Sequence, residues 1–565
     1  MASIYEQLSA ERKKLQRSGE VPEWMTTGGY QMFKQKYLWQ GKNVCETFRR
    51  IADCAAKHMP AGTEKSWSDR FYDILNSGTL GASTPVLANM GTDRGMPVSC
   101  SGQVVQDSID SFYRSGHELA MLTKDGFGTS SYLGNIRPRG SDISKGGKAS
   151  GVMPVLKAYV EIMKDVAQGT ARRGAGAWYL PIDHGDYYEV VNYLERNPDD
   201  LNVGWVITDE FIARLQSGDH ESAKRLARAM KVKAVTGKGY YFFVDKVNRG
   251  KPEAYKRLDL DVLASNLCTE INLFSDADHS FTCVLSSLNL ATYDEWKDTD
   301  AIFVATVFLD CVVSEYLAQA KGKSGFDKTV RFTEKSRALG LGVMGYHTYL
   351  QSKMIPFESL EAHFINLSIF KDLNVKSLEA SQWLAKTFGE PEWCKGLGIR
   401  NTHRTAVAPT TTNAIICKGV SQGIEPVVAN IYTQQTSAGV LYRVNPVFLK
   451  LAKERGKFNK ELVDDLTNNS NGSVQHLDWL SDHEKLVFKT AYEIDQNVIV
   501  RKAAVRQPEL CQGQSLNLFF SADAPEEYIL QVHQEAFLNE NIYALYYLRT
   551  KAGVLASKGE CSSCE

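Results

Sequence analysis

Three side chains able to do radical or acid–base chemistry stand together in SNLCTEINLF, residues 265–274. Asn266, Cys268 and Glu270 alternate there with Leu and Thr. In an extended segment, this alternation projects all three side chains to one side. A lone cysteine is best interpreted as structural. An amide and a carboxylate each cost about 2–7 kcal/mol to bury without partners, however, and groups that costly to bury are typical of catalytic sites.

A second pair of thiols lies at the end of the chain, where Cys561 and Cys564 form a CxxC motif in KAGVLASKGECSSCE. The motif fits half of a zinc site or a redox dithiol. No second CxxC or HxxxH lies nearby, which favours the dithiol. The small, polar and glycine residues predict a flexible tail. The 14 residues from Tyr547 to Cys561 span roughly 20 Å as a coil and about 45–50 Å when extended, so the dithiol can reach an interior site.

A tail that delivers electrons needs a buried disulfide to receive them. Cys100 in MPVSCSGQ and Cys283 in FTCVLSS lie in strand-like runs with small neighbours that leave room for a substrate. The eleven cysteines are odd in number and widely scattered, which argues against a secreted disulfide scaffold and for a reducing cytosol. We interpret the other six as structural: Cys45, Cys54, Cys311, Cys394, Cys417 and Cys511.

Two further motifs each allow a structural and a functional interpretation. APTTTNAIICKG, residues 408–419, places three threonines and an asparagine before a helix-like run, which fits plain helix capping or a phosphate site on free backbone N–H groups. IYALYYLRT contains Tyr543, Tyr546 and Tyr547, which fit a buried aromatic segment or a path for an electron with its proton.

The GxGxxG match in GLGVMG, Gly340 to Gly345, is interpreted differently. The preceding RFTEKSRA is a charged, helix-like run and not a strand, so the context of a dinucleotide site is missing. We expect these glycines to serve close packing of a helix.

The elements that must position these groups fall into three regions. Residues 1–80 are expected to be helical, residues 81–550 alternate short strand-like runs with helices as in an α/β sheet or barrel, and residues 551–565 form the tail. The 565 residues are 23% charged and 43% hydrophobic, with a net charge of −1 and no long basic run, which gives no support for binding DNA, RNA or a membrane surface. We find neither a signal peptide nor an apolar run of about 18 residues, so no transmembrane helix is expected.

Together these motifs closely resemble the large, catalytic subunit of class I ribonucleotide reductase, from about residue 20 to the end. The resemblance rests on ordered, well-separated motifs: STPVLANMGTDRGMPVSC, QDSID, GNIRPRGS, QGTARRGAGAW, NLCTEI, TCVLSSLNL, PTTTNAIICKGVSQGIEP, YALYYLRT and CSSC. It implies a ten-stranded α/β barrel with a catalytic finger loop, preceded by a short helical region. The family's ATP-binding cone has no room before residue 20, so we expect specificity control without a dATP on/off switch.

The resemblance also implies roles for the cysteines. Cys268 matches the thiyl-radical cysteine that removes the 3′ hydrogen of the ribose, with Glu270 as the base for the 3′ hydroxyl and Asn266 as its amide partner. Burial is expected to raise the pKa of such a glutamate. The pair that reduces the 2′ position and ends as a disulfide matches Cys100 and Cys283. The tail dithiol, Cys561 and Cys564, matches the one that reduces this disulfide and is renewed by thioredoxin or glutaredoxin.

Nucleotide sites follow by resemblance as well. The positions that match substrate contacts are Thr84, Ser99, Gly128, Thr410, Thr411, Thr412 and Asn413, the last four in the diphosphate-binding turn. Many relatives have an acidic residue and more serines there, so individual contacts differ. The site for a dNTP or ATP effector with Mg²⁺, at the interface of a homodimer, matches Asp107, Ser108 and Arg137, with Lys145 as a further basic contact. Gln168 and Arg172 match the loop that relays effector identity.

The partners and the compartment complete the expectations. Tyr546 and Tyr547 resemble the class I radical-transfer dyad, which implies a separate small subunit whose metal cofactor generates the radical, with no metal site and no tightly bound cofactor in this chain. The alternative is the adenosylcobalamin-dependent class, which shares the cysteines. A nucleotide-binding protein without catalytic activity would not be expected to keep all five of the cysteines assigned above. A general thiol–disulfide oxidoreductase would be expected to carry its CxxC on a compact βαβ unit. We expect ribonucleoside diphosphates as substrates and the cytoplasm, or the host cytoplasm of a virus, as the compartment.

Overall fold

The computed structural model describes residues 4–98, 100–166, 174–436 and 439–550. Its first part is helical, as expected. In the third helix, Asn43 and Glu46 form a capping box that satisfies two free N–H groups, and Phe48 and Ile51 lie on the buried face. The helices are α1 (Ile4–Arg17), α2 (Thr27–Lys36), α3 (Val44–Ala56) and α4 (Glu64–Asn76).

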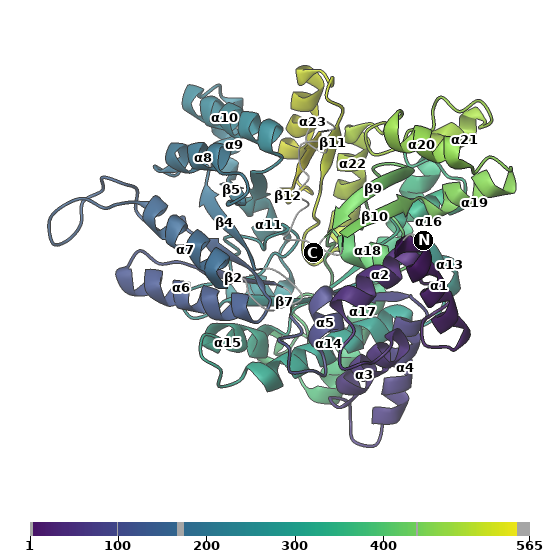
Figure 1. Cartoon of the computed structure of the whole chain (residues 1–565). Helices are drawn as coiled ribbons and strands as arrows, with labels where there is room; N and C mark the ends of the chain where they lie inside the picture. Colours follow the sequence, from purple (N-terminus) through teal and green to yellow (C-terminus); the bar gives the residue numbers. More distant parts are fainter. Residues whose placement is uncertain (1–3, 99, 167–173, 437–438, 551–565) are drawn as a thin grey trace.

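Five parallel strands, β2 to β6, form one half of the central sheet. At least one helix returns the chain between each two consecutive strands, which is the kind of crossover that parallel strands need. Figure 1 shows α6 to α10 along the outside of this half. The strands are β2 (Cys100–Val104), β3 (Gly128–Tyr132), β4 (Ala175–Pro181), β5 (Val203–Ile207) and β6 (Tyr240–Phe243); the helices are α5 (Thr84–Asn89), α6 (Ile109–Lys124), α7 (Val152–Val166), α8 (Tyr187–Arg196), α9 (Asp209–Gln216), α10 (His220–Thr236), α11 (Val244–Gly250) and α12 (Glu253–Leu258).

The second half runs antiparallel to the first. Strand β7 (Phe281–Asn289) pairs antiparallel with β2 and with the short β1 (Leu80–Ala82), and parallel with β8 (Leu339–Met344). On its other edge, β8 bonds to segment 404–407, and this segment bonds in turn to segment 512–516. The carbonyl of Leu516 then accepts the N–H of Tyr546, which brings the chain to the next barrel segment. Strand β12 (Ala544–Leu545) then pairs antiparallel with β6. Ten extended segments thus close in a ring, which confirms the ten-stranded α/β barrel.

The remaining elements cover the barrel. Figure 1 places α14 and α17 beside the N-terminal helices, and β9, β10 and α19 to α21 on the opposite side from α6 and α7. They are η1 (Leu290–Thr292), α13 (Tyr293–Trp296), α14 (Ala301–Ala320), α15 (Asp327–Ser336), α16 (Tyr346–Ser352), α17 (Leu360–Phe388), η2 (Glu392–Cys394), α18 (Thr411–Ile416), β9 (Ile431–Thr436), β10 (Gly439–Val444), α19 (Pro446–Glu454), α20 (Lys460–Asn468), α21 (Asp482–Val487), α22 (Gln496–Arg506), η3 (Gln507–Glu509), β11 (Leu518–Phe520), α23 (Glu526–Leu538) and β13 (Leu548–Thr550).

Helix α14 is long and apolar enough to cross a membrane, although the sequence led us to expect no such segment. The structure buries 72% of its apolar window inside the protein. It packs against α17, α3 and α4 and against the barrel strands β7 and β8. A helix that is apolar on all sides and surrounded by other elements is typical of a protein core.

The strand β8 corrects the expectation for GLGVMG, because Gly340 to Met344 lie in a barrel strand and the strand glycines Gly340 and Gly342 face neighbouring barrel segments. A Cβ atom on Gly342 would lie 2.3 Å from the carbonyl oxygen of Ala406, and one on Gly340 would lie 2.4 Å from Leu285 and 3.1 Å from the sulfur of Cys283. The glycines therefore allow neighbouring barrel segments to approach each other and leave space for a cysteine.

Candidate functional site

The residues around Cys268 form a loop inside the barrel, as the resemblance implied, and not the extended segment that their alternation suggested. Thr269 has a left-handed φ of 70°. Asn266 Oδ1 accepts the N–H of Ile271 at 3.2 Å, which closes the turn. The N–H of Gly513 donates to Glu270 O at 2.8 Å, which ties the loop to a barrel segment. The predicted side chains converge because of this turn and not because of strand alternation.

All three predicted side chains are buried: Cys268 is 5% exposed, Glu270 1% and Asn266 0%. The hydroxyl of Tyr546 donates to the sulfur of Cys268 at 3.5 Å. Ser515 Oγ lies 2.5 Å from Cys268 O and 3.0 Å from Glu270 Oε2, so it bonds to both members of the predicted pair. The barrel interior thus brings a thiol, a phenol and a carboxylate to one place.

The second predicted thiol pair lies on adjacent strands of the same interior. Cys100 and Cys283 are directly opposite partners of β2 and β7, so their side chains share one face. Such partners have Cβ atoms about 4.5–5.5 Å apart, close to the separation that a disulfide needs. Asn266 Nδ2 donates to the sulfur of Cys100 at 3.5 Å, which links the pair to the loop. Burial raises the pKa of Cys283 well above its usual value and so favours its protonated thiol.

Gln512 is a contact that the sequence did not single out. Its Nε2 lies 3.7 Å from the sulfur of Cys283 and 2.9 Å from Leu339 O, and its Oε1 accepts the N–H of Asn272. The side chain thereby connects β8, the loop and the thiol. Its only signal was a polar run, CQGQS, in a region otherwise rich in apolar residues.

Tyr546 and Tyr547 belong to a cluster of three tyrosines. Their ring centroids lie 4.1 Å apart. Tyr240, on β6, lies 4.7 Å from the ring of Tyr546 and donates its hydroxyl to that of Tyr547 at 3.1 Å. Tyr543 lies partly buried at the edge of the same core. Sequence reasoning missed Tyr240 because GYYFF has the composition of an ordinary barrel strand.

The described members of the predicted substrate-contact set lie on β3, at the start of α5 and at the start of α18. Gly128 is the cross-strand partner of Cys100. Thr84 starts α5, and its hydroxyl lies 3.1 Å from that of Tyr37. Asn413 donates to the carbonyl of Gly81, so the start of α18 adjoins the junction of β1 and α5.

Residues 410–412 form the turn before α18. Thr410 has a φ of 58° and makes no side-chain cap, which excludes plain capping by this residue. Its Oγ1 instead accepts the N–H of Gly423 at 2.8 Å. Thr411 bonds to Gln422, and the buried hydroxyl of Thr412 has no hydrogen-bond partner among the described residues.

Three of the predicted effector residues are neighbours in space. Arg137 Nε lies 2.5 Å from Asp107 Oδ2, and Ser108 caps α6 by accepting the N–H of Ser111. Lys145 lies exposed on the loop before α7, which projects from the body in Figure 1. The predicted residues Ser99, Gln168, Arg172, Cys561 and Cys564 lie outside the described residues.

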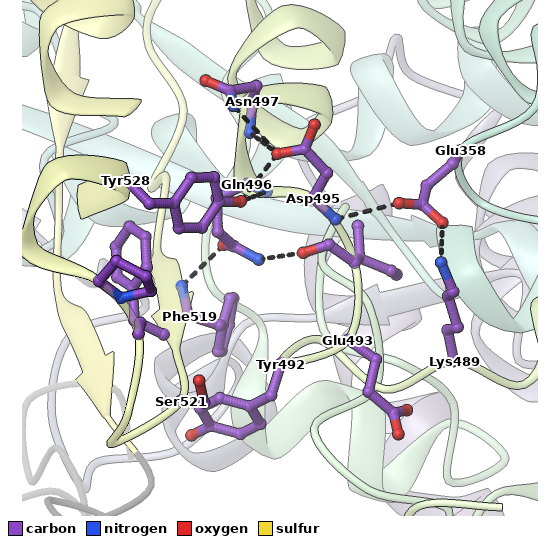
Figure 2. A pocket seen from close by; sticks show the side chains of 14 residues that line it. Glu358, Lys489, Tyr492, Glu493, Asp495, Gln496, Asn497, Phe519, Ser521 and Tyr528 are labelled. Atoms are coloured by element: carbon purple, nitrogen blue, oxygen red, sulfur yellow. Dashed lines mark hydrogen bonds and ion pairs between the residues drawn. The ribbon is translucent and has the colours of Figure 1, made fainter. Parts of the chain in front are cut away.

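A polar cavity of about 540 Å³ lies apart from these groups, between the start of α22 and the end of β11. Figure 2 shows Lys489 bonded to Glu358, and Tyr528 bonded to Asp495 and Gln496. None of the predicted site residues lines it. Over the described ranges, no group of three His, Cys, Asp or Glu residues is arranged to hold a metal ion.

Comparisons with known proteins agree with this barrel fold. The profile of the ribonucleotide reductase barrel domain matches residues 98–225, 219–396 and 391–548, and that of the all-alpha domain matches residues 24–95. The class I d ribonucleotide reductase alpha subunit of Actinobacillus ureae superposes with a TM-score of 0.87 at 38% identity, over 95% of this chain and 99% of that one.

Curated relatives point the same way. A protein of Frog virus 3 (isolate Goorha), assigned as a ribonucleoside-diphosphate reductase large subunit, is 34% identical over 89% of this chain and 94% of its own length. A vitamin B12-dependent ribonucleoside-diphosphate reductase of Thermoplasma acidophilum is 28% identical over 93% of this chain and 71% of its own. A ten-stranded barrel with these relatives defines an enzyme of the ribonucleotide reductase class. The chain belongs to the ribonucleotide reductase family, as a large, or alpha, subunit.

Proposed function

We propose that this chain is the catalytic subunit of a class I enzyme that reduces ribonucleoside diphosphates to 2′-deoxyribonucleoside diphosphates, through a thiyl radical on Cys268. The contact of Tyr546 with Cys268, at 3.5 Å, carries the proposal. It joins a group that can pass an electron with its proton to a thiol in the same buried interior as Cys100 and Cys283.

In the proposed mechanism, the radical on Cys268 takes the 3′ hydrogen of the ribose and returns it at the end. Glu270 accepts the proton of the 3′ hydroxyl, and Asn266 hydrogen-bonds to the sugar. Ser515 holds the carboxylate of Glu270 and the carbonyl of Cys268 in one orientation. General-base catalysis of this kind requires hydrogen-bond reach between the base and the proton that it accepts.

The proposed reduction consumes two thiols. Cys100 and Cys283 supply two electrons and two hydrogens, the 2′ hydroxyl leaves as water, and the two sulfurs form a disulfide. Their directly opposed strand positions support this pairing. The tail thiols Cys561 and Cys564 then reduce the disulfide by exchange, and thioredoxin or glutaredoxin renews them. Exchange requires the attacking sulfur to reach the disulfide, which suits a dithiol on a tail.

The exchange with the tail gives a testable prediction. A Cys561→Ser/Cys564→Ser variant is expected to lose nearly all turnover with thioredoxin, because the protein reductant cannot reach a disulfide inside the barrel. It should keep activity with dithiothreitol, which is small enough to enter. Turnover is measured with both reductants, and Cys45→Ser, in the N-terminal helices, is the control. Equal activity of the double variant with both reductants would contradict the shuttle.

The source of the radical distinguishes two classes of enzyme. We propose that Tyr546 and Tyr547 receive it from a separate small subunit with a metal cofactor, because their rings and Tyr240 form a continuous aromatic path to Cys268. An adenosylcobalamin-dependent enzyme, the alternative, needs no such path. Likeness to the class I d alpha structure also favours the first.

Nucleotides are proposed to bind at two places. Thr84, Ser99, Gly128 and the turn formed by residues 410–413 would hold the substrate, and Asp107, Ser108, Arg137 and Lys145 a dNTP or ATP effector with Mg²⁺. Gln168 and Arg172 would relay which effector is bound. The contact of Arg137 with Asp107 supports this effector site, because it brings two of the proposed ligand groups together.

A homodimer is proposed to form through α6, which leaves the large apolar side chains of Ile109 and Tyr113 69% and 77% exposed. Exposed apolar side chains of this size on one helix are typical of an interaction surface.

The nine described cysteines are all free thiols, which suits a reducing cytoplasm.

The decisive experiment combines the purified chain with its cognate small subunit, dithiothreitol and an effector. We expect ribonucleoside diphosphates to be converted to deoxyribonucleoside diphosphates only when the small subunit is present. The product is measured by chromatography, with the small subunit alone as the control. Turnover with adenosylcobalamin alone, and none with the small subunit, would overturn the class I assignment.

A further inference from the structure

The peptide group that joins Tyr546 to Tyr547 interrupts the ladder of the barrel. Tyr546 N–H bonds to Leu516 O, but the N–H of Leu518 donates to Tyr547 O and not to Tyr546 O. Strand pairing accordingly stops after β12 and resumes at β13. Irregular pairing of this kind leaves backbone groups that need other partners, and it is over-represented next to active sites. The two groups concerned are Tyr546 C=O and Tyr547 N–H.

A buried lysine donates a hydrogen bond to the first of these groups, the carbonyl of Tyr546. Lys233, on α10, is 1% exposed. Its ammonium donates to Tyr546 O and, at 2.9 Å, to Gly239 O. It lies 5.0 Å from the ring centroid of Tyr241, and over the described ranges no carboxylate lies within ion-pair distance of it. Burial lowers the pKa of Lys233 to about 7. A lysine buried without a counter-ion is costly, so its bonds to these two carbonyls are the interactions that compensate.

An asparagine that is bonded to a buried glutamate accepts a hydrogen bond from the second group, the N–H of Tyr547. Asn517 Oδ1 accepts the N–H of Tyr547 at 3.0 Å. Asn517 Nδ2 donates to Glu425 Oε1 at 2.6 Å, which fixes which end of the amide faces the tyrosine. Glu425 is 9% exposed, and burial raises its pKa to about 7. The guanidinium of Arg549 lies 4.5 Å from the ring centroid of Tyr547. Its positive charge lowers the pKa of Glu425 and so partly opposes the effect of burial.

We propose that Lys233 and the Asn517–Glu425 pair are positioning residues that clamp the peptide group between Tyr546 and Tyr547. The clamp sets the position of both rings, and with them the contact of Tyr546 with Cys268. Rigid support matters because a reactive group displaced by about 1 Å can lose 10²-fold in rate. The inference rests on the proposed role of the two tyrosines in radical transfer.

The first test replaces Lys233 with methionine, which keeps most of the volume and removes the N–H donors. With the small subunit and dithiothreitol, kcat is expected to fall about 10- to 100-fold, while KM for the diphosphate stays within about twofold of the wild-type value, because the clamp touches no proposed substrate contact.

The matched control for this test is Lys246→Met. Lys246 is 3% exposed and donates to the carbonyls of Ala536, Phe537 and Asn539, so its replacement removes the same kind of bond away from the two tyrosines. An equal fall in kcat for both variants would show a general cost of losing a buried lysine, and would overturn the clamp.

The second test stays informative if Lys233→Met does not fold. Glu425→Gln keeps an oxygen that accepts from Asn517, whereas Glu425→Leu removes it. We expect Glu425→Gln to keep kcat within about threefold of wild type and Glu425→Leu to lose at least about tenfold. Equal kcat values for the two variants would contradict the proposed orientation of Asn517.

A spectroscopic measurement separates positioning from simple destabilisation. Tyr546 is replaced by 3-aminotyrosine, which is oxidised more easily than tyrosine and so retains the radical. In the holoenzyme with Lys233→Met, the electron paramagnetic resonance signal at this position is expected to lose yield or change shape, while Lys246→Met leaves it unchanged. An unchanged signal in both would overturn the clamp.

The failure of the clamp can be told from the failure of the radical path. If Tyr546→Phe and Tyr547→Phe both remain active, the proposed path itself is wrong. If both are inactive and Lys233→Met retains wild-type kcat, the path stands and the clamp alone is wrong.

Discussion

Replacing Cys268 with serine is expected to reduce deoxyribonucleotide formation by at least about 10⁴-fold, the size of loss seen when a group that performs the chemistry is removed. Serine occupies nearly the same volume, but its O–H bond is much harder to break homolytically than an S–H bond. No radical able to take the 3′ hydrogen would then form. Product is measured with the small subunit, effector and dithiothreitol present.

Two controls make this result specific to the thiol chemistry of Cys268. Cys45→Ser changes a half-buried thiol of α3 and should leave turnover unchanged. The Cys268→Ser variant should melt within a few degrees of wild type and still bind the diphosphate, because the loop keeps its bonds through Asn266 and Ser515. Deoxynucleotide formation by a folded Cys268→Ser variant above one-tenth of the wild-type rate would rule out this cysteine as the radical site.

Replacing Tyr546 with phenylalanine has the second largest expected effect. The change removes one hydroxyl, the group that donates to Cys268, and leaves the ring and its packing against Tyr240 in place. Phenylalanine cannot pass an electron with a proton, so turnover with the small subunit should fall at least about 10³-fold. Binding of the diphosphate and thiol–disulfide exchange at Cys100 and Cys283 should be retained.

The matched control is Tyr316→Phe, which removes the hydroxyl of another fully buried tyrosine. That hydroxyl joins α14 to α15 by donating to Thr329 at 2.8 Å, and it does not bond to a cysteine. It should cost stability of about 1 kcal/mol and little activity. If the Tyr546→Phe enzyme is as active as the Tyr316→Phe enzyme, the radical does not pass through Tyr546.

The chemistry of the site was largely predictable from the sequence, because reactive side chains are rare and their types are informative. The alternation of Asn266, Cys268 and Glu270 indicated a costly polar burial, and the terminal CxxC indicated a redox role. Ordered motifs gave the family and its barrel. The prediction that Cys268, Cys100 and Cys283 share one interior agrees with their common core cluster, whereas their roles remain proposals.

The resemblance implied a loop at Cys268, but the turn that makes its side chains converge was not predictable from the alternation of residues. Strand alternation was the wrong argument for residues 266–270, because a turn with Thr269 in the left-handed region brings the side chains together. GLGVMG was likewise assigned to helix packing and forms β8. Short apolar runs do not distinguish a barrel strand from a buried helix, since their local periodicity is the same in both.

Sequence alone therefore determined the kind of chemistry, since that depends on which side chains are present and in which order. Tertiary structure decided which other groups surround the reactive side chains. Lys233, Glu425, Gln512 and Ser515 come from segments far from Cys268 in the chain or from ordinary-looking contexts. These groups make long-range hydrogen bonds, and no local pattern of residues encodes a contact between groups that lie 92 to 313 residues apart in sequence.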